Sequence, residues 1–221
     1  SPVVRDDFAG RYGVSYFGFA AVGIAVSGIL VGTMSAFSGA LREAQLDGTL
    51  EAILLAPIPH VRLVALIGVW PLLFGFVAGG VTLAIAGLAG ATFSVHVVAL
   101  VVVALLSVVA FAGLGLIAAA AVLVVKRGDP VAALIGMAGT LAGGAYMTTS
   151  TFPGWLRAVA AVNPMNAALD AWRGALLGGG AGLAGPLLGL AALAAVAVPF
   201  GWWLCGRAID VARHDGTLAA Y

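Results

Sequence analysis

Long apolar stretches without Asp, Glu, Lys or Arg dominate the chain, at residues 14–41, 63–125, 131–156 and 174–206. The hydrocarbon core of a bilayer is about 30 Å thick, so a helix crosses it with roughly 20 residues. The stretch 63–125 is too long for one crossing and must turn back on itself. Two glycines and two hydroxyl side chains interrupt it between Gly87 and Ser94, which predicts a helical hairpin with its turn there.

The pattern predicts an all-α, polytopic transmembrane helix bundle that forms a single domain over residues 1–221. Barrel strands alternate polar and apolar residues over about 10 positions, whereas these apolar runs are continuous. We expect about five spans, at about 14–40, 62–87, 95–125, 131–149 and 184–206.

Composition supports a membrane protein. Hydrophobic residues make up 62% of the 221 residues and charged residues only 9%, against about 25% charged residues in soluble domains. The formal charge of +1 gives no reason to expect a nucleic-acid partner, and the single Cys205 excludes an internal disulfide.

Basic residues indicate the orientation. A cytoplasmic C-terminus puts six basic residues inside and four outside, which agrees with the positive-inside rule. The inside set is Arg42, Arg62, Lys126, Arg127, Arg207 and Arg213, and the outside set is Arg5, Arg11, Arg157 and Arg173. Enrichment in Ala, Gly and Val is typical of GC-rich bacterial genomes, so we expect a bacterial cytoplasmic membrane.

Residues 41–57 break the pattern of plain spans. Apolar and polar residues alternate there at helical spacing, which predicts an amphipathic helix at the cytoplasmic surface, ended by Pro57 and Pro59. The apolar face would carry Leu46, Leu50, Ile53 and Leu54, and the polar face Gln45, Asp47, Thr49 and Glu51. Two interpretations stay open: a helix that merely joins two spans, or a docking helix for a cytoplasmic partner, which its carboxylates favour.

Residues 152–178 form the second unusual segment, predicted as two short helices that dip into the outer membrane face. Trp155 and Trp172 are expected at the interface. Asn163 and Pro164 suit a helix start, with Asn as the cap and Pro in the first turn. Asp170 and Arg173 are one helical turn apart and can pair while facing the bundle interior, where a structural salt bridge is favoured over substrate contact.

The sequence contains no recognisable nucleotide-binding or catalytic motif. Its only lysine, Lys126, is followed by Arg127, so a phosphate-binding Gly-Lys-Ser/Thr loop is absent. His60, His96 and His214 fall near predicted span ends, which argues against an intramembrane enzyme. Gly139, Gly143 and Gly144, or Gly113 and Gly115, could let helices approach closely, although in a chain with 32 glycines such spacing easily arises by chance.

The two unusual segments together resemble the permease subunit of type-2 ATP-binding-cassette exporters. Their order and spacing match that family, while the spans between them match in hydropathy alone. The resemblance is carried by Arg42-Glu43, Gly48-Thr-Leu-Glu51-Ala-Ile-Leu-Leu-Ala-Pro57, Phe152-Pro-Gly-Trp-Leu156, Asn163-Pro164 and Asp170-Ala-Trp-Arg173. The family has an amphipathic elbow helix and a first span that this sequence lacks, so it is either a fragment or a five-span relative.

The resemblance implies a role for each segment. Residues 41–57 would be a coupling helix seated in a cleft of the ATPase subunit, with Arg42, Glu43, Asp47, Gly48, Thr49, Leu50, Glu51 and Pro57 as its site residues. Residues 152–178 would form an outer re-entrant gate, with Phe152, Pro153, Trp155, Asn163, Pro164, Asp170 and Arg173.

The expected function is the export of a hydrophobic or amphipathic substrate, such as a drug-like molecule, a lipid or a glycan, by a permease dimer. The resemblance places ATP and Mg²⁺ on a separate cytoplasmic ATPase subunit and leaves this chain without a catalytic residue, cofactor or metal. The spans carry no charged residue at depth, which disfavours a highly charged solute. A non-transporting membrane scaffold and a secondary transporter are the alternatives.

Overall fold

Four long helices and one shorter helix build the described part of the protein. The computed structural model describes residues 16–49, 60–91, 93–125, 136–137, 139–140, 145, 153–155, 160, 163–177 and 182–214. The helices are α2 (Tyr16–Leu46), α4 (His60–Leu88), α5 (Val97–Val125), α8 (Pro164–Leu177) and α9 (Ala184–His214). All except α8 are long and apolar enough to cross a membrane. The predicted all-α bundle is therefore confirmed.

Four of the five predicted spans correspond to described helices: α2, α4, α5 and α9. α2 continues to Leu46 and therefore includes Arg42 and Glu43, which we expected in the next segment. Most of the predicted span 131–149 lies outside the described residues, so this span stays a prediction.

The predicted turn between α4 and α5 is confirmed, but the two helices do not pack along each other as a helical hairpin would, because α4 packs on α2 and α5 packs on α2 and α9. Gly90 has a φ of 98°, which favours glycine. The Ala91 amide donates to the Ala86 carbonyl at 2.9 Å across this turn. This bond satisfies a carbonyl of the last helical turn, as glycine-ended helices commonly do.

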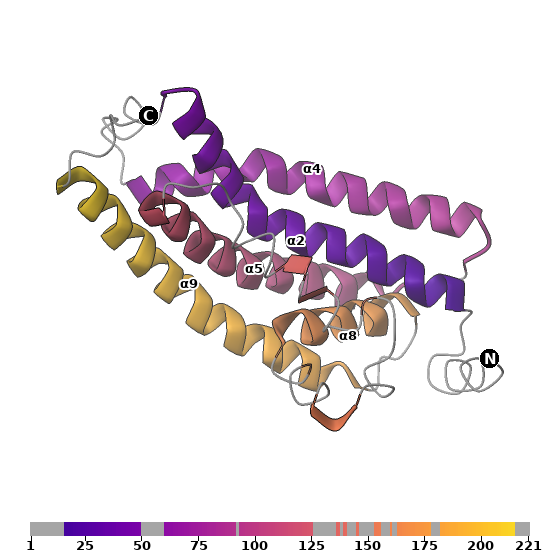
Figure 1. Cartoon of the computed structure of the whole chain (residues 1–221). Coiled ribbons are helices and arrows are strands. Elements are labelled where there is room, and N and C mark those ends of the chain that lie inside the picture. The colour runs from indigo at the N-terminus through magenta and orange to yellow at the C-terminus, as the bar shows by residue number, and fades with distance from the viewer. Residues whose placement is uncertain are drawn as a thin grey trace.

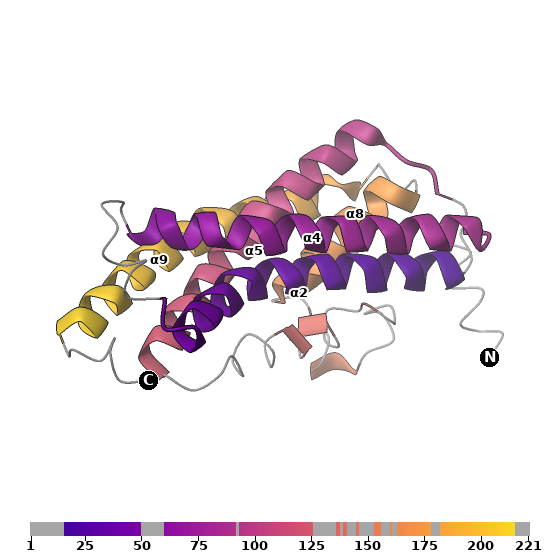
Figure 2. The ribbon, with the colours of Figure 1, turned by 90° about the horizontal axis from the view of Figure 1, so that it is seen from above.

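The helices pack around α2 and α5. α5 packs against α2 on one side and α9 on another, α4 packs mainly on α2, and α8 contacts α2, α5 and α9. Figure 1 and Figure 2 show that α2, α5 and α9 end, and α4 begins, at one end of the bundle. α8 lies toward the opposite end.

Glycines set the closest helix contacts. A Cβ atom at Gly113 of α5 would lie 2.7 Å from the Ala197 carbonyl carbon of α9, and one at Gly201 would lie 2.6 Å from the Gly113 oxygen. A Cβ at Gly115 would lie 2.8 Å from the Met34 oxygen of α2. The α5 backbone thus touches both neighbours, an approach that small residues permit in membrane helices.

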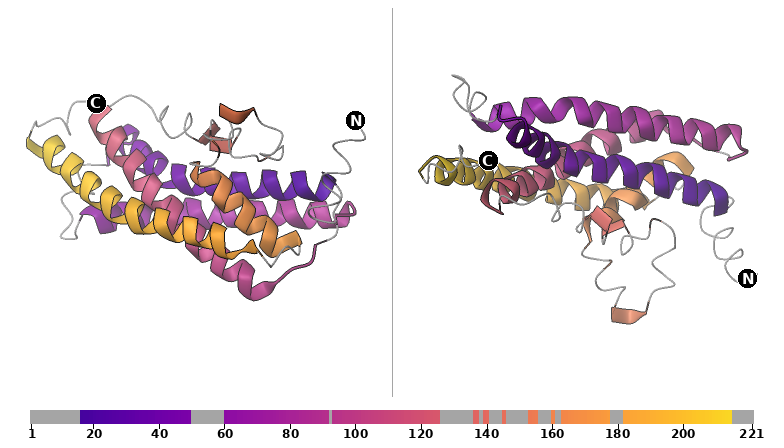
Figure 3. Two further views of the ribbon diagram at one scale, coloured as in Figure 1. Left: turned by 90° about the horizontal axis from the view of Figure 1, so that it is seen from below. Right: turned by 45° about the horizontal axis from the view of Figure 1, so that its top comes forward.

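α4 lies at one side of the bundle, next to α2 (Figure 3, right). Large apolar side chains are exposed along it: Leu66, Trp70, Leu73, Phe74, Val77, Val81 and Ile85. Such a continuous apolar surface suits lipid or another membrane helix rather than water.

Candidate functional site

The polar end of α2 carries the first group of predicted site residues. The helix ends at Leu46, and the chain turns at Asp47 and Gly48, where φ is 67° at the glycine. The Asp47 amide donates to the Glu43 carbonyl at 2.9 Å, and the Thr49 amide to the Ala44 carbonyl at 3.1 Å. The segment 41–57 is therefore not one continuous helix, because Gly48 caps α2 within it.

The structure exposes most of the described residues in this segment. Glu43, Asp47, Gly48 and Thr49 are exposed, and Arg42 is half-buried. Two carboxylates thus project at the end of the bundle where α5 and α9 also finish (Figure 1). The remaining predicted coupling residues, Leu50, Glu51 and Pro57, lie outside the described residues, so the coupling role stays a prediction.

The start of α8 follows the predicted local rule. Pro164 is its first residue, and the Asn163 Oδ1 accepts a hydrogen bond from the Met165 amide at 3.0 Å. This confirms Asn163 as the cap and Pro164 in the first helical position. The Asn163 Nδ2 also donates to the Gly139 carbonyl at 2.8 Å, which ties the helix start to a distant part of the chain.

Arg173 is the most deeply buried charged residue of the candidate gate, with 2% of its surface exposed. Its guanidinium carbon lies 3.7 Å from the centre of the Phe19 ring in α2, and one terminal nitrogen donates to the Ala145 carbonyl at 3.0 Å. A cation over an aromatic face in a desolvated site is strongly favourable. Asp170 is half-buried, and its predicted pairing with Arg173 stays a prediction.

Trp172 contradicts its predicted place at the membrane interface. Only 4% of its surface is exposed, and its Nε1 donates to the Ser107 Oγ of α5 at 3.1 Å. The indole is buried because this side of α8 packs into the main apolar cluster of the bundle. Trp155, the other expected interfacial aromatic, is 71% exposed, as is usual for an interfacial side chain.

The end of α8 is held by the loop between α4 and α5. The Ser94 amide donates to the Leu176 carbonyl at 3.0 Å, and the His96 amide to the Ala175 carbonyl at 3.1 Å. These carbonyls lack partners within the helix, so the loop satisfies them. No local pattern signalled this contact, which joins residues far apart in the sequence.

Two other predicted gate residues are exposed: Pro153 and Trp155. Phe152 lies outside the described residues. The predicted gate residues Asn163 and Arg173 thus contact other parts of the bundle, whereas the described residues 153–155 are exposed. Among the residues that the structure describes, no group of three or more His, Cys, Asp or Glu could hold a metal ion.

A comparison of the sequence with protein families shows the family of this chain. Residues 8–177 match the membrane-domain profile described as ABC-2 type transporter. The chain belongs to this family. The matched range contains residues 41–57 and all but the last residue of 152–178, and it ends at the last residue of α8. No curated protein is a significant match to the sequence.

Membership of the ABC-2 family gives the chain its general function. It is the permease component of an ABC transporter, an integral membrane protein that is not itself catalytic. Permeases of this family typically work with an ATPase partner.

Proposed function

We propose that this ABC-2 permease exports a hydrophobic or amphipathic substrate from the cytoplasm by alternating access. Two permease copies would associate with two cytoplasmic ATPase subunits, which hold ATP and Mg²⁺. Residues 41–57 would seat in the ATPase, and α8 with its preceding residues would close the outer end of the pathway.

The observation that carries this proposal is the course of α2. One uninterrupted helix of 31 residues joins the exposed carboxylates at one end to the α8 contact at the other. Phe19, which lies under the Arg173 guanidinium, and Glu43 are about 36 Å apart along the helix at about 1.5 Å per residue. No residue of α2 leaves the helical conformation between these two positions, although the helix bends toward its C-terminal end (Figure 1), so the two sites are joined by a single bent helix.

The physical step follows from that connection. Closure of the ATPase dimer around nucleotide would push on residues 41–57 and tilt α2. Because Phe19 moves with α2, the tilt would shift the surface on which Arg173 rests. The conformation at the ATPase end and the conformation at the outer end of the permease would then change together, as alternating access requires.

The apolar spans support an apolar or amphipathic substrate. Within the four described spans, charged residues occur only close to the helix ends that carry Arg42 and Arg207. The buried polar side chains deeper in these spans are small hydroxyls: Ser27, Thr33, Ser38 and Ser107. Spans of this composition offer no counter-charge to a highly charged solute.

The orientation with a cytoplasmic C-terminus belongs to this proposal. Arg42, Arg62 and Arg207 lie near the end of α2, the start of α4 and the end of α9, which share one end of the bundle (Figure 1). A basic end of this kind favours the cytoplasmic side.

Affinity purification of the full-length chain in mild detergent tests the proposal. We expect an ATP-binding-cassette ATPase to co-purify, and we expect a scrambled sequence over residues 50–57 to abolish its recovery. Scrambling residues 215–221, which lie outside both candidate segments, is the control and should leave recovery unchanged. Failure to recover an ATPase under several gentle conditions, with the permease intact, would favour a scaffold or a secondary transporter.

A further inference from the structure

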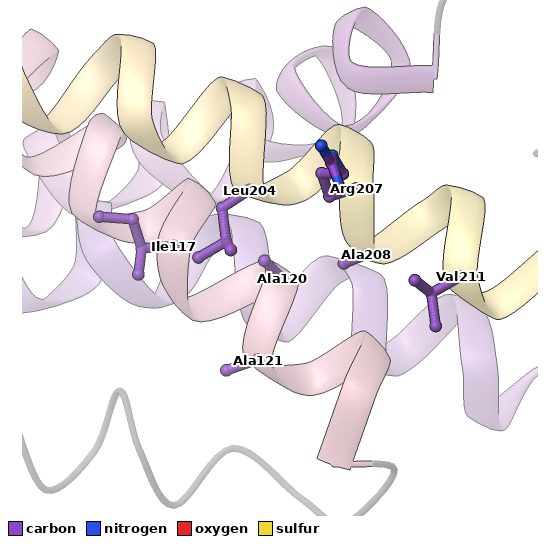
Figure 4. Close-up of a pocket in the computed structure, with 7 residues that line it drawn as sticks. All are labelled: Ile117, Ala120, Ala121, Leu204, Arg207, Ala208 and Val211. Carbon is purple, nitrogen blue, oxygen red and sulfur yellow. The ribbon is translucent and has the colours of Figure 1, made fainter.

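A pocket of about 310 Å³ opens between α5 and α9, toward the end of the bundle where both helices finish (Figure 4). Six of its lining residues are apolar: Ile117, Ala120, Ala121, Leu204, Ala208 and Val211. The seventh is Arg207, an exposed residue and the only charged one in the lining. The volume is at the lower end of the range of about 300–1,000 Å³ for ligand sites.

The depth of Arg207 matches the level of lipid headgroups. The candidate span of α9 covers Ala184–Val211, so its centre lies near Ala197. At about 1.5 Å per residue, Arg207 is about 15 Å from that centre, which is half of a hydrocarbon core about 30 Å thick. The apolar residues Leu204 and Ile117 lie deeper, at the level of the acyl chains.

Exposed aromatic side chains near the pocket are typical of a membrane interface. Trp202 and Trp203 are exposed on α9, one turn deeper than Arg207. The Arg207 guanidinium carbon lies 5.3 Å from the centre of the Trp203 ring, so the arginine is held beside the aromatic face. Asp210 is exposed on the next turn and does not line the pocket. Arg207 therefore gives the pocket lining a positive charge.

We propose that this pocket binds an anionic phospholipid of the adjacent leaflet. Its acyl chain would lie along Ile117, Leu204 and the small residues between the helices, and Arg207 would hold its phosphate. An amphiphile with a single anionic head fits because the pocket has one cation, at headgroup level, in an otherwise apolar lining that extends to both sides of it. The inference does not depend on the direction of transport or on the ATPase.

Native mass spectrometry of the full-length permease tests the site directly. Phosphatidylglycerol and phosphatidylcholine with identical acyl chains are titrated separately, and bound lipid per chain is counted. We expect phosphatidylglycerol to bind more tightly to the native protein. Arg207→Gln should weaken phosphatidylglycerol binding about fivefold, the effect of one basic residue at a membrane surface, and leave phosphatidylcholine binding unchanged.

Matched variants separate this site from general attraction to the surface. Arg62→Gln removes an exposed cation near the start of α4, outside the pocket, and should change phosphatidylglycerol binding less than twofold. Ala121→Leu should fill the pocket and weaken both lipids, whereas Ala195→Leu, at an exposed position of α9 outside the lining, should weaken neither. Far-ultraviolet circular dichroism confirms that each variant folds.

Three outcomes would overturn the proposal. Equal affinity of the native protein for both lipids would remove the role of the phosphate. Equal loss in Arg207→Gln and Arg62→Gln would show only diffuse surface attraction. A lower dimer fraction in Ala121→Leu, with lipid binding unchanged, would identify the pocket as a contact between two permease copies.

Discussion

α8 and the polar end of α2 are both short, functionally marked segments of one permease, yet they are held in opposite ways. α8 is fixed by side chains and loops from elsewhere: Ser107, Phe19, and the backbone of residues 94–96. From Leu46 to Thr49, by contrast, the chain is exposed and is shaped by its own backbone turn at Gly48. Contacts within the chain explain the position of α8. In our proposal, the carboxylates at the end of α2 instead contact a second protein, the ATPase.

Arg173→Met gives the largest expected effect and tests the anchoring of α8. Methionine keeps an apolar stem but loses the hydrogen bond to the Ala145 carbonyl and the contact with Phe19. We expect a loss of about 3 kcal/mol in the free energy of unfolding, since charge-assisted hydrogen bonds and desolvated cation–π contacts contribute about 2 kcal/mol each and part is recovered by packing. Unfolding in mixed detergent micelles measures it.

Arg62→Met is the matched control for that variant, because Arg62 is exposed near the start of α4. A change within about 0.5 kcal/mol is expected there. Equal stability of the two variants would mean that the buried arginine does not anchor α8.

Trp172→Phe should have an intermediate effect. The ring stays apolar but the hydrogen bond from Nε1 to the Ser107 Oγ is lost, so we expect destabilisation by about 1 kcal/mol. The double variant with Ser107→Ala should be less destabilised than the sum of the two single variants, because the residues share one bond. Strict additivity in this double-mutant cycle would contradict the contact.

The smallest effect on stability is expected at the end of α2. Asp47→Arg reverses an exposed charge and should change the free energy of unfolding by less than about 0.5 kcal/mol. Glu51→Arg, in the predicted coupling segment, should likewise leave membrane insertion intact. Both should nevertheless reduce ATPase recovery or stimulated ATP turnover, because they reverse charges on the proposed contact.

Asp210→Arg is the control for those charge reversals, since Asp210 is exposed on α9 outside the coupling segment. Its ATPase recovery should match that of the native protein. Normal assembly and turnover in Asp47→Arg and Glu51→Arg would argue against docking at this segment.

Local rules predicted much of the fold from the sequence. The apolar lengths predicted α2, α4, α5 and α9, because the membrane requires long continuous runs. Gly90 marked the turn between α4 and α5, and Asn163 with Pro164 marked the start of α8. Each of these signals is contained within a few neighbouring residues.

Contacts between distant residues were not predictable in the same way. The burial of Trp172 depends on which side of α8 meets α5, and the interfacial preference of tryptophan says nothing about that. The Arg173 contact with Ala145 has no local pattern either. At Gly48 a signal was present, since glycine commonly ends helices, but the apolar periodicity on both sides of it favoured one long helix.

The glycine contact between α5 and α9 also bears on how this sequence can drift during evolution. Gly113 and Gly201 leave no space for a methyl group at either position. The exposed apolar positions of α4, by contrast, accept any apolar side chain of suitable length. Related permeases that keep this helix crossing should therefore retain very small residues at these two positions together, while the α4 surface varies freely among Leu, Val, Ile and Phe.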